Sequence, residues 1–513
     1  MLGNYFIIDP KYKSDVFDKV WIHFLFCPGK EDTSITKEEL RKNMNITELD
    51  SGLFSQDLTM FLNEPEPKGS SRFNKKPVKI VVATRQFMGD TIALRGYGDI
   101  ASGVRELGYV RKLFPEATCS FVFEHYAADI DELNRLRSIA TFDDVKTYIL
   151  DGHHQQGFRP PEQQQLAAVH QEKEVCQLLH EANFILHGPS GLIAPLANSK
   201  GEFASKTVGV SEYETKSGDY SETGRHGIEE IDMGFSCQRL YLMENTYPDT
   251  VFKDDLLRKY CANPLSKSSD GNDQSVFYFV YGHDEYFLAQ ALRVLVLMEG
   301  DNDRDVVLVS SRQLNPGYFS KHFPEQQPDF FPYKSVNLFK INSDDKKDVI
   351  MTFQNPVGQK EKNVNIIIPD RIVDSDFDLL QQSSVINWSS GDISISDVLA
   401  KGKIPIIEQY KKWYLFKEVV ITMEKFCAIP GNEQYALLIA PWKTASANLP
   451  DNTVGSLKNN PDKRVSLQQL LGAQWQAFER DFTDWLKKNN QTESFIREKA
   501  EAIIRKTIFA EKD

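Results

Sequence analysis

Short apolar runs alternate with amphipathic stretches along most of this chain. Runs such as Val78–Thr84 are rich in β-branched residues and end in polar or glycine-containing segments, which is typical of buried strands. Stretches such as Ile100–Phe114 place apolar residues at every third or fourth position, the spacing of an amphipathic helix. In the first half we predict the strands Val78–Thr84, Cys119–Phe123, Lys146–Leu150, Asn183–His187 and Lys206–Val210, and the helices Ile100–Phe114, Asp129–Ile139 and Glu162–Ala182.

A second series of the same kind follows the polar segment Pro264–Asp273. Strands that alternate with helices in this way form parallel sheets through right-handed crossovers. We therefore predict an α/β fold with two Rossmann-like domains that face each other across a cleft. The strands predicted in this half are Val276–Val280, Val306–Val309, Lys346–Phe353, Val364–Ile368, Val385–Trp388 and Ile404–Ile407, and the helices are Glu285–Met298, Phe377–Gln382 and one that begins near Ile393 and ends before Gly402.

The 513 residues leave room for segments outside these two domains. We expect residues 1–76 to form an N-terminal extension and a linker, because Glu64–Lys76 is rich in Pro, Gly and Ser. The first Rossmann-like domain is then 77–263 and the second is 264–460. Residues 461–513 are predicted to be C-terminal helices.

The stretch Val385–Lys403 contains the most informative turn of the chain, where a predicted strand ends in small polar residues and a helix follows. Such a turn exposes backbone N–H groups at a helix N-terminus, where unpaired donors and the helix dipole stabilise an anion. The residues that could hold a phosphate or diphosphate are Ser389, Ser390, Gly391, Asp392 and Ser394. The same turn also fits a helix whose N-terminus is capped by Ser390 or Asp392, and the pattern does not choose between the two.

Charged residues near strand ends add further candidates. Lys403 or Arg371 could supply positive charge to a diphosphate, or could be a solvated surface base. Glu408 follows the last predicted strand and could bind ribose hydroxyls, as in dinucleotide-binding folds, or could simply begin a helix. Asp99 follows two glycines beyond a strand end, so it is a candidate general base; as an alternative, it caps the next helix.

Two of these segments resemble loops of glycosyltransferases of the GT-B fold, and in particular of the bacterial protein-arginine rhamnosyltransferase acting on elongation factor P. Ser390-Gly391-Asp392-Ile393-Ser394, followed by Ala400, Gly402-Lys403 and Pro405, resembles the donor loop of that family. Tyr97-Gly98-Asp99-Ile100, with Gly103-Val104 nearby, resembles its N-terminal glycine–aspartate loop. The chain departs from the family pattern around the donor-loop glycine, where it has Ser390, Asp392 and Ile393, and upstream of the first loop, where it has Arg95.

The resemblance implies a GT-B glycosyltransferase that uses a nucleotide-diphosphate sugar without a metal or other cofactor. It implies donor binding in the second domain, at Ser389–Ser394 together with Lys403 and Glu408, and an acceptor site with the base Asp99 in the first. It does not specify rhamnose, thymidine diphosphate or an arginine acceptor. The acceptor could be a protein, shaped by the N-terminal extension, the polar loop Glu212–Gly227 and the helical tail.

Two alternatives remain open at this level. One is a nucleotide-sugar epimerase or hydrolase of the same fold. The other is a non-catalytic interaction protein built on a degenerate transferase fold, which the departures from the family pattern keep open.

The net charge and the cysteine content limit the binding partners and the cellular compartment that we expect for this chain. The net charge of −13 argues against broad binding of nucleic acid or of an anionic membrane, since both need a large basic surface. Six scattered cysteines without a Cys-x-x-Cys pair indicate a reduced protein. The N-terminus lacks the pattern of a signal peptide, and the longest apolar helix is too short to span a bilayer. We expect a soluble cytoplasmic protein, and an acidic cytosolic chain could also be a bacterial effector that acts in a host.

Three other motifs suggest chemistry but have weaker support. His187-Gly188-Pro189-Ser190-Gly191 lacks the Gly-x-Ser-x-Gly spacing of a hydrolase elbow, so we interpret it as a strand-end turn. His153-His154 has no evident partner ligands for a metal. Asp301-Asn302-Asp303 and Asp374-Ser375-Asp376 match the Asp-x-Asp pattern of metal-dependent GT-A transferases, which we favour less than a metal-independent enzyme.

Overall fold

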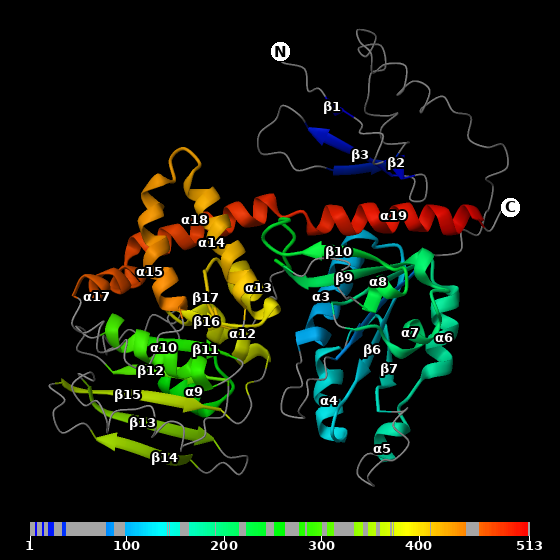
Figure 1. Cartoon of the computed structure of the whole chain (residues 1–513). Helices are drawn as coiled ribbons and strands as arrows, with labels where there is room; N and C mark the ends of the chain where they lie inside the picture. Colours follow the sequence, from blue (N-terminus) through cyan, green and yellow to red (C-terminus); the bar gives the residue numbers. More distant parts are fainter. Residues whose placement is uncertain are drawn as a thin grey trace.

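The structure is a computed structural model of the whole chain (Figure 1). It describes the strand backbones at 6–7, 13–14, 19–24 and 33–36, and residues 78–86, 98–140, 142, 144–153, 164–189, 191–214, 222–242, 251–261, 276–282, 285–299, 305–311, 333–341, 347–354, 360–369, 372, 374–410, 412–447 and 461–510.

The first sheet has six parallel strands in the order β10-β9-β8-β5-β6-β7. Because side chains alternate along a strand, Ile80 and Val82 pack toward α3 and α4 on one face, whereas Val81 and Ala83 pack toward α6 and α7 on the other. We call this sheet and its helices the first unit. Its elements are β5 (Lys79–Arg85), α3 (Gly98–Leu113), β6 (Thr118–His125), α4 (Ile130–Ile139), β7 (Lys146–Asp151), α6 (Glu172–Glu181), β8 (Phe184–His187), α7 (Ala194–Asn198), β9 (Thr207–Tyr213) and β10 (Glu229–Met233).

The second sheet has seven strands in the order β14-β13-β15-β12-β11-β16-β17, and only the edge strand β14 runs antiparallel to its neighbour. Tyr278 and Val280 pack toward α10, whereas Phe277 and Phe279 pack toward α9 and α12. We call this sheet and its helices the second unit. Its elements are α9 (Asp255–Tyr260), β11 (Val276–Tyr281), α10 (Glu285–Met298), β12 (Val306–Ser310), β13 (Tyr333–Ile341), β14 (Lys347–Gln354), β15 (Lys360–Ile368), α12 (Asp374–Ser383), β16 (Asn387–Ser389), α13 (Asp392–Ala400) and β17 (Ile406–Ile407).

The C-terminal helices join the two units. The helix α18 packs on the second unit, whereas α19 lies along the first unit, where it contacts α3 and β10 (Figure 1). At the crossing, the Asn490 amide donates to the carbonyl of Leu240 and accepts from its N–H, each at 2.9 Å. The helices of this part are α14 (Trp413–Cys427), α15 (Ala436–Ser446), α17 (Pro461–Gln468), α18 (Ala473–Asn489) and α19 (Thr492–Ala510).

Before the first unit, the strands β1 (Phe6–Ile7), β2 (Lys13–Ser14), β3 (Lys19–Phe24) and β4 (Thr33–Thr36) form a small antiparallel sheet. The predicted class, two parallel α/β units followed by a helical tail, is therefore confirmed. The strands β10 and β13 were not predicted. The segment of β10 carries a weak apolar pattern, whereas β13 is rich in apolar residues and could have been recognised.

The prediction of one helix over Glu162–Ala182 is wrong, because the structure has two helices there, α5 (Gln164–Ala167) and α6. The break lets side chains between the two helices pair with β7, an edge strand whose outer N–H groups need partners. Gln171 accepts a hydrogen bond from the N–H of Ile149, and His170 accepts one from the N–H of Asp151, each at 3.0 Å. A continuous helix would not present both side chains to the strand edge.

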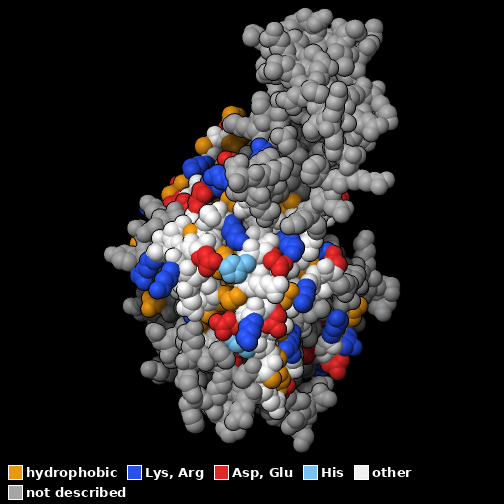
Figure 2. Space-filling view, turned by 90° about the vertical axis from the view of Figure 1, so that its right-hand side faces the viewer, with side chains coloured by type: hydrophobic (Ala, Val, Ile, Leu, Met, Phe, Trp, Pro, Cys, Tyr) orange, Lys and Arg blue, Asp and Glu red, His pale blue; other side chains and the backbone are white. Residues whose placement is uncertain are grey.

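The face shown in Figure 2 carries charged side chains of both signs, mixed with single hydrophobic ones. Surface ion pairs of the first unit include Lys79 with Glu181 at 2.6 Å and Arg111 with Asp144 at 2.5 Å. No described helix combines the length and the apolar character needed to cross a bilayer.

Candidate functional site

In each of the two large sheets, strands are added first on one side of the first strand and later on its other side, which defines a switch point. In the first sheet β5 lies between β6 and β8, so the helices that follow β5 and β8 leave the sheet in opposite directions. In the second sheet β11 lies between β12 and β16, and the same geometry recurs. Ligands of open α/β sheets bind outside the carboxyl ends of the strands at such a switch point. The two switch points are therefore the first places to look for a site.

The two switch points lie close together because α3 and α13 touch. Helix α3 follows β5 and helix α13 follows β16, and the two helices pack against each other at the centre of the molecule (Figure 1). Arg105 of α3 forms a buried ion pair with Asp397 of α13. The predicted donor turn and the predicted base, Asp99, thus lie at the beginnings of two neighbouring helices.

The donor turn lies at the switch point of the second sheet, as its sequence suggests. Both the N–H and the hydroxyl of Ser390 donate to the carbonyl of Tyr281, at 3.1 and 3.3 Å, and the Ser394 hydroxyl donates to the carbonyl of Gly391 at 2.8 Å. Gly391 is the N-cap of α13, and no side chain caps the helix there. Capping by Ser390 or Asp392 is therefore not observed, and no capping side chain satisfies the first N–H groups of α13.

Asp392 connects the turn to the first unit. One carboxylate oxygen accepts a hydrogen bond from the N–H of Tyr213 at 3.0 Å, and the other lies 3.1 Å from the ammonium of Lys412. Both oxygens of Asp392 thus have partners inside the protein.

Lys412 is a cation of this site that the sequence analysis did not identify. Burial opposes its charge, but the carboxylates of Asp392, Glu212 and Asp99 outweigh this effect and raise the pKa of Lys412 above its ordinary value. Its position, five residues after the carboxyl end of β17, is the signal that could have indicated it. Lys412 stands where groups from both units meet.

The two other charged candidates, Glu408 and Lys403, lie at opposite edges of the second sheet. Glu408 follows β17 directly, is buried, and so lies at the same sheet edge as the donor turn. Lys403 precedes β17 and donates to the carbonyl of Ser384, which precedes β16, so it lies at the opposite, amino edge of the sheet. Burial lowers the pKa of Lys403 to about 8. The structure does not bring Lys403 together with the turn, and Arg371 lies outside the described residues.

Asp99 is the second residue of α3, so it lies inside the helix rather than in the capping position before it. Its carbonyl accepts a hydrogen bond from the Thr84 hydroxyl at 2.9 Å, which ties the helix start to the end of β5. The side chain is partly exposed, and its charge contributes to the raised pKa of Lys412. Asp99 therefore acts electrostatically on Lys412, which pairs with Asp392 of the Ser389–Ser394 turn.

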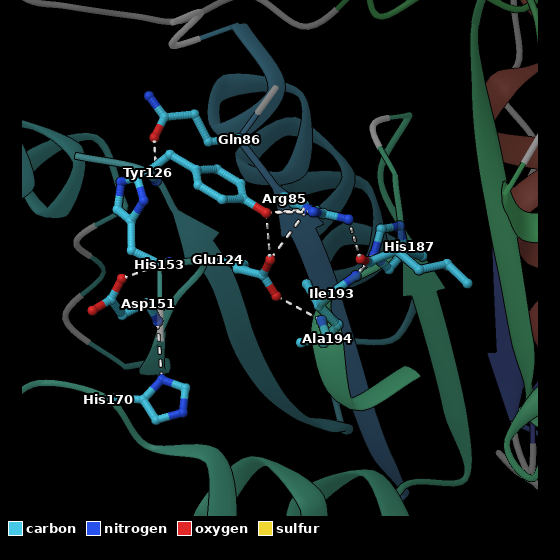
Figure 3. A network of polar contacts seen from close by, with 11 residues as sticks. Arg85, Gln86, Glu124, Tyr126, Asp151, His153, His170, His187, Ile193 and Ala194 are labelled. Carbon is cyan, nitrogen blue, oxygen red and sulfur yellow. Dashed lines mark hydrogen bonds and ion pairs between the residues drawn. The ribbon is translucent and has the colours of Figure 1, made fainter. Parts of the chain in front are cut away.

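A polar cluster at the carboxyl ends of β5 and β6, made of Arg85, Gln86, Glu124 and Tyr126, was not predicted (Figure 3). The Arg85 guanidinium donates to the Tyr126 hydroxyl at 2.9 Å and lies 3.1 Å from the carboxylate of Glu124. Glu124 also accepts from the N–H of Ala194 at 2.6 Å, and Gln86 accepts from the N–H of Tyr126 at 2.8 Å. These bonds hold the four side chains in place at the carboxyl ends of β5 and β6, and we call this cluster the polar wall.

The other motifs of the sequence have structural partners. His187 accepts from the N–H of Ile193 at 3.1 Å, and burial lowers the pKa of His187 to about 4, so this neutral histidine holds the turn that follows β8. The Asp376 carboxylate accepts from the N–H groups of Lys253 and Asp254, at 2.7 and 2.9 Å.

The ring of His153 packs edge-on against Tyr126 at 5.3 Å (Figure 3). The neighbouring residue, His154, lies outside the described residues, as do residues 301–303. Among the residues that the structure describes, no group of three or more His, Cys, Asp or Glu could hold a metal ion.

Comparison with known proteins gives no match to a family model and no match to a curated protein. Solved structures with a similar course of the chain are glycosyltransferases by name. The calicheamicin glycosyltransferase CalG4 aligns with a TM-score of 0.36 and 9% identity over 84% of this chain and 98% of its own. A glycosyltransferase from Rickettsia africae aligns with a TM-score of 0.39 and 11% identity over 84% and 99%. MurG from Acinetobacter baumannii aligns with a TM-score of 0.35 and 10% identity over 80% and 100%. Similarity at this level does not assign this chain a substrate or an activity.

Proposed function

We propose that this protein is a GT-B glycosyltransferase that transfers a sugar from a nucleotide-diphosphate sugar to an acceptor without a metal ion. The observation that supports this most is the meeting of the two switch points. The uncapped start of α13 and the cation Lys412 lie opposite the carboxylate of Asp99, within its electrostatic reach. A donor of negative charge and an acceptor that must lose a proton need groups of these two kinds.

The donor is proposed to bind at the start of α13. Backbone N–H groups of Asp392, Ile393 and Ser394 would bind the diphosphate, helped by the helix dipole. Glu408, at the end of the neighbouring strand, would accept hydrogen bonds from hydroxyls of the ribose or the sugar. Ser389 and Gly391 shape the turn, and their backbone would follow the diphosphate.

Transfer then requires one bond to form and one to break at the anomeric carbon. The Asp99 carboxylate takes the proton of the acceptor group, and the electron pair of that group attacks the anomeric carbon. The bond from that carbon to the diphosphate oxygen breaks, and its electron pair leaves with the nucleoside diphosphate. Lys412 and the α13 N–H groups stabilise this developing charge.

The acceptor would lie against the first unit, near Asp99 and the polar wall of Arg85 and Glu124. A protein acceptor is proposed because three segments outside the two sheets could extend the surface: the N-terminal strands, α8 (Glu222–Arg225) and α19. The cytosol, of the producing cell or of a host, is the proposed compartment, since all five cysteines that the structure describes are free.

A nucleotide-sugar screen tests the proposal directly. UDP-, GDP- and dTDP-sugars are added to the protein with and without Mg²⁺, and the melting temperature is recorded. A ligand at about 100 times its Kd should stabilise the native protein by about 2.7 kcal/mol, so one nucleotide should raise the midpoint clearly. The rise should be the same after addition of a chelator. A rise that appears only with metal would contradict the metal-independent mechanism.

Replacement of Lys412 by glutamine is expected to weaken binding of that nucleotide diphosphate about tenfold to 100-fold, because a charged hydrogen bond contributes roughly 1.5–3 kcal/mol. Glutamine keeps a donor for Asp392 but removes the charge. Calorimetric titration measures the affinity. The matched control is Lys443→Gln, since Lys443 pairs with Glu424 at 3.1 Å between α14 and α15. Equal affinities in both variants would exclude Lys412 from the donor site.

One observation favours a non-catalytic protein on the same fold as the second candidate. The hydroxyls of Ser390 and Ser394 are used inside the turn, and the oxygens of Asp392 bind Lys412 and Tyr213. A turn with these internal bonds needs no ligand to be stable. Absence of any nucleotide-dependent rise across the screen would favour this candidate over the transferase.

A further inference from the structure

Tyr213, the last residue of β9, connects the first unit to α13 through two hydrogen bonds and makes a third within the first unit. Its backbone N–H donates to the Asp392 carboxylate at 3.0 Å, and its hydroxyl is hydrogen-bonded to the hydroxyl of Ser396. The same phenolic oxygen accepts from the N–H of Tyr241 at 2.6 Å. Tyr213 and Ser396 are both buried.

These contacts involve one face of α13. Asp392 and Ser396 are four residues apart, so they lie one above the other on the helix surface, and both bind Tyr213. Asp397, next to Ser396, pairs with Arg105. The first two turns of α13 are therefore held by the first unit, although the helix belongs to the second unit.

The serine side chains of this turn are buried in this arrangement, whereas Gly391, Asp392 and Ile393 are partly exposed. Ser389, Ser390 and Ser394 expose only 1%, 1% and 5% of their surface. The backbone of Tyr213 lies against the first turn of α13, since its N–H reaches the side chain of Asp392. The first unit therefore covers part of the turn, and we describe this arrangement as closed.

We propose that Tyr213 is a latch that holds the two units closed over the start of α13, and that opening of the latch gives a ligand fuller access to this turn. The effect on the donor rests on the proposed function, whereas the latch itself does not. Opening breaks the contacts of the Tyr213 hydroxyl with Ser396 and frees the first turn of α13, while Asp392 keeps its pair with Lys412 inside the second unit.

The substitution Tyr213→Phe tests the latch without removing the ring. The phenylalanine ring keeps its stacking on Tyr241, whose ring centroid is 5.8 Å away, but neither Ser396 nor the N–H of Tyr241 retains its partner. Hydrogen exchange of the amides in 98–113 and 392–400, followed by mass spectrometry, should become about threefold to tenfold faster, the loss expected for a neutral hydrogen bond. Unchanged exchange in both helices would overturn the proposal.

Two further variants make this test specific. Tyr435→Phe also removes a tyrosine hydroxyl, which donates to Asp481 at 2.6 Å within the C-terminal helices, and should leave exchange in α3 and α13 unchanged. Ser396→Ala removes the same contact from the opposite side and should act as Tyr213→Phe does. Because both break one interaction, the double variant should exchange about as fast as the faster single variant. Fully additive effects would contradict a shared contact.

Measurements of nucleotide binding distinguish a failure of the latch proposal from a failure of the proposed function. UDP, GDP and dTDP are the probes, and the nucleotide that binds the wild type should bind Tyr213→Phe about threefold to tenfold more tightly, because less of the variant is closed. Weaker binding would mean that Tyr213 supports the site, and would overturn its role as a barrier. If neither protein binds a nucleotide, the proposed donor site is wrong, and the exchange result alone decides on the latch.

Discussion

Asparagine in place of Asp99 is expected to lower kcat by two to four orders of magnitude while leaving donor affinity almost unchanged. A positioned general base contributes about that much to a proton-transfer step. Asparagine has nearly the same shape but cannot take the acceptor proton. The start of α3 should remain intact, because the Thr84 hydroxyl binds the backbone carbonyl of residue 99 rather than its side chain. Steady-state turnover with the nucleotide-sugar found in the screen measures the effect.

The control for this experiment is Asp129→Asn. Asp129 also lies at the beginning of a helix that follows a strand of the first sheet, and its carboxylate accepts from the N–H of Glu132 at 2.8 Å. Asparagine caps helices about as well as aspartate, so this variant should keep full activity. Wild-type turnover in Asp99→Asn would exclude Asp99 as the base.

Replacement of Glu106 by glutamine is expected to remove a pH dependence of stability that is large for one residue. Glu106 is fully buried in α3, and burial raises its pKa from 4.5 to about 8, although a hydrogen bond from the Tyr241 hydroxyl at 2.8 Å acts in the opposite direction. Between these two values the folded protein holds a proton that the unfolded chain has released. The stabilisation is therefore complete below about pH 4.5 and is lost as the pH rises through 8.

The slope follows from linkage. Within this window the free energy of unfolding should fall by about 1.4 kcal/mol per pH unit through Glu106 alone, or roughly 5 kcal/mol over the whole range. Glutamine accepts the same hydrogen bond and carries no proton to lose. The variant should therefore become progressively more stable, relative to the wild type, as the pH is raised from 5 to 8. Urea unfolding at four pH values in this range measures the difference.

Other buried groups titrate in the same range, so the comparison must be made between two proteins at each pH. Burial raises the pKa of Glu479 to about 7, but this contribution is the same in wild type and variant and cancels. The exposed Glu116 provides a control, and Glu116→Gln should follow the wild type at every pH. Parallel curves for Glu106→Gln and the wild type would show that Glu106 is already ionised at pH 7.

The sequence predicted the order of strand, turn, helix and strand around Ser389–Ser394 well because its signals are local. An apolar run, a group of small polar residues, a helical pattern and a second run fall within about 25 residues, and β16, α13 and β17 form in that order. It was harder to predict which charged residues lie at the carboxyl ends of the strands. Lys403 precedes β17 and Lys412 follows it, so only Lys412 and Glu408 reach the carboxyl edge. The choice of Lys403 ignored this direction of the strand.

The contacts between the two units could not be predicted from local pattern. Arg105 and Asp397 are 292 positions apart, and Tyr213 and Ser396 are 183 positions apart. Nothing in the neighbourhood of Tyr213 indicates that it binds α13, since an aromatic residue at a strand end usually packs in the core. The polar wall of Arg85 and Glu124 was missed for a similar reason, because a charged residue that ends an apolar run usually faces solvent.

The polypeptide passes from the first unit to the second and then returns to the first in α19. It leaves the first unit before α9, builds the second unit, and returns along α19 to lie beside α3 and β10. The chain thus joins the units twice, so in the proposed opening of the latch the units would stay tethered at both places. Cleavage of the chain at one of the two connections would leave the two units covalently joined through the other.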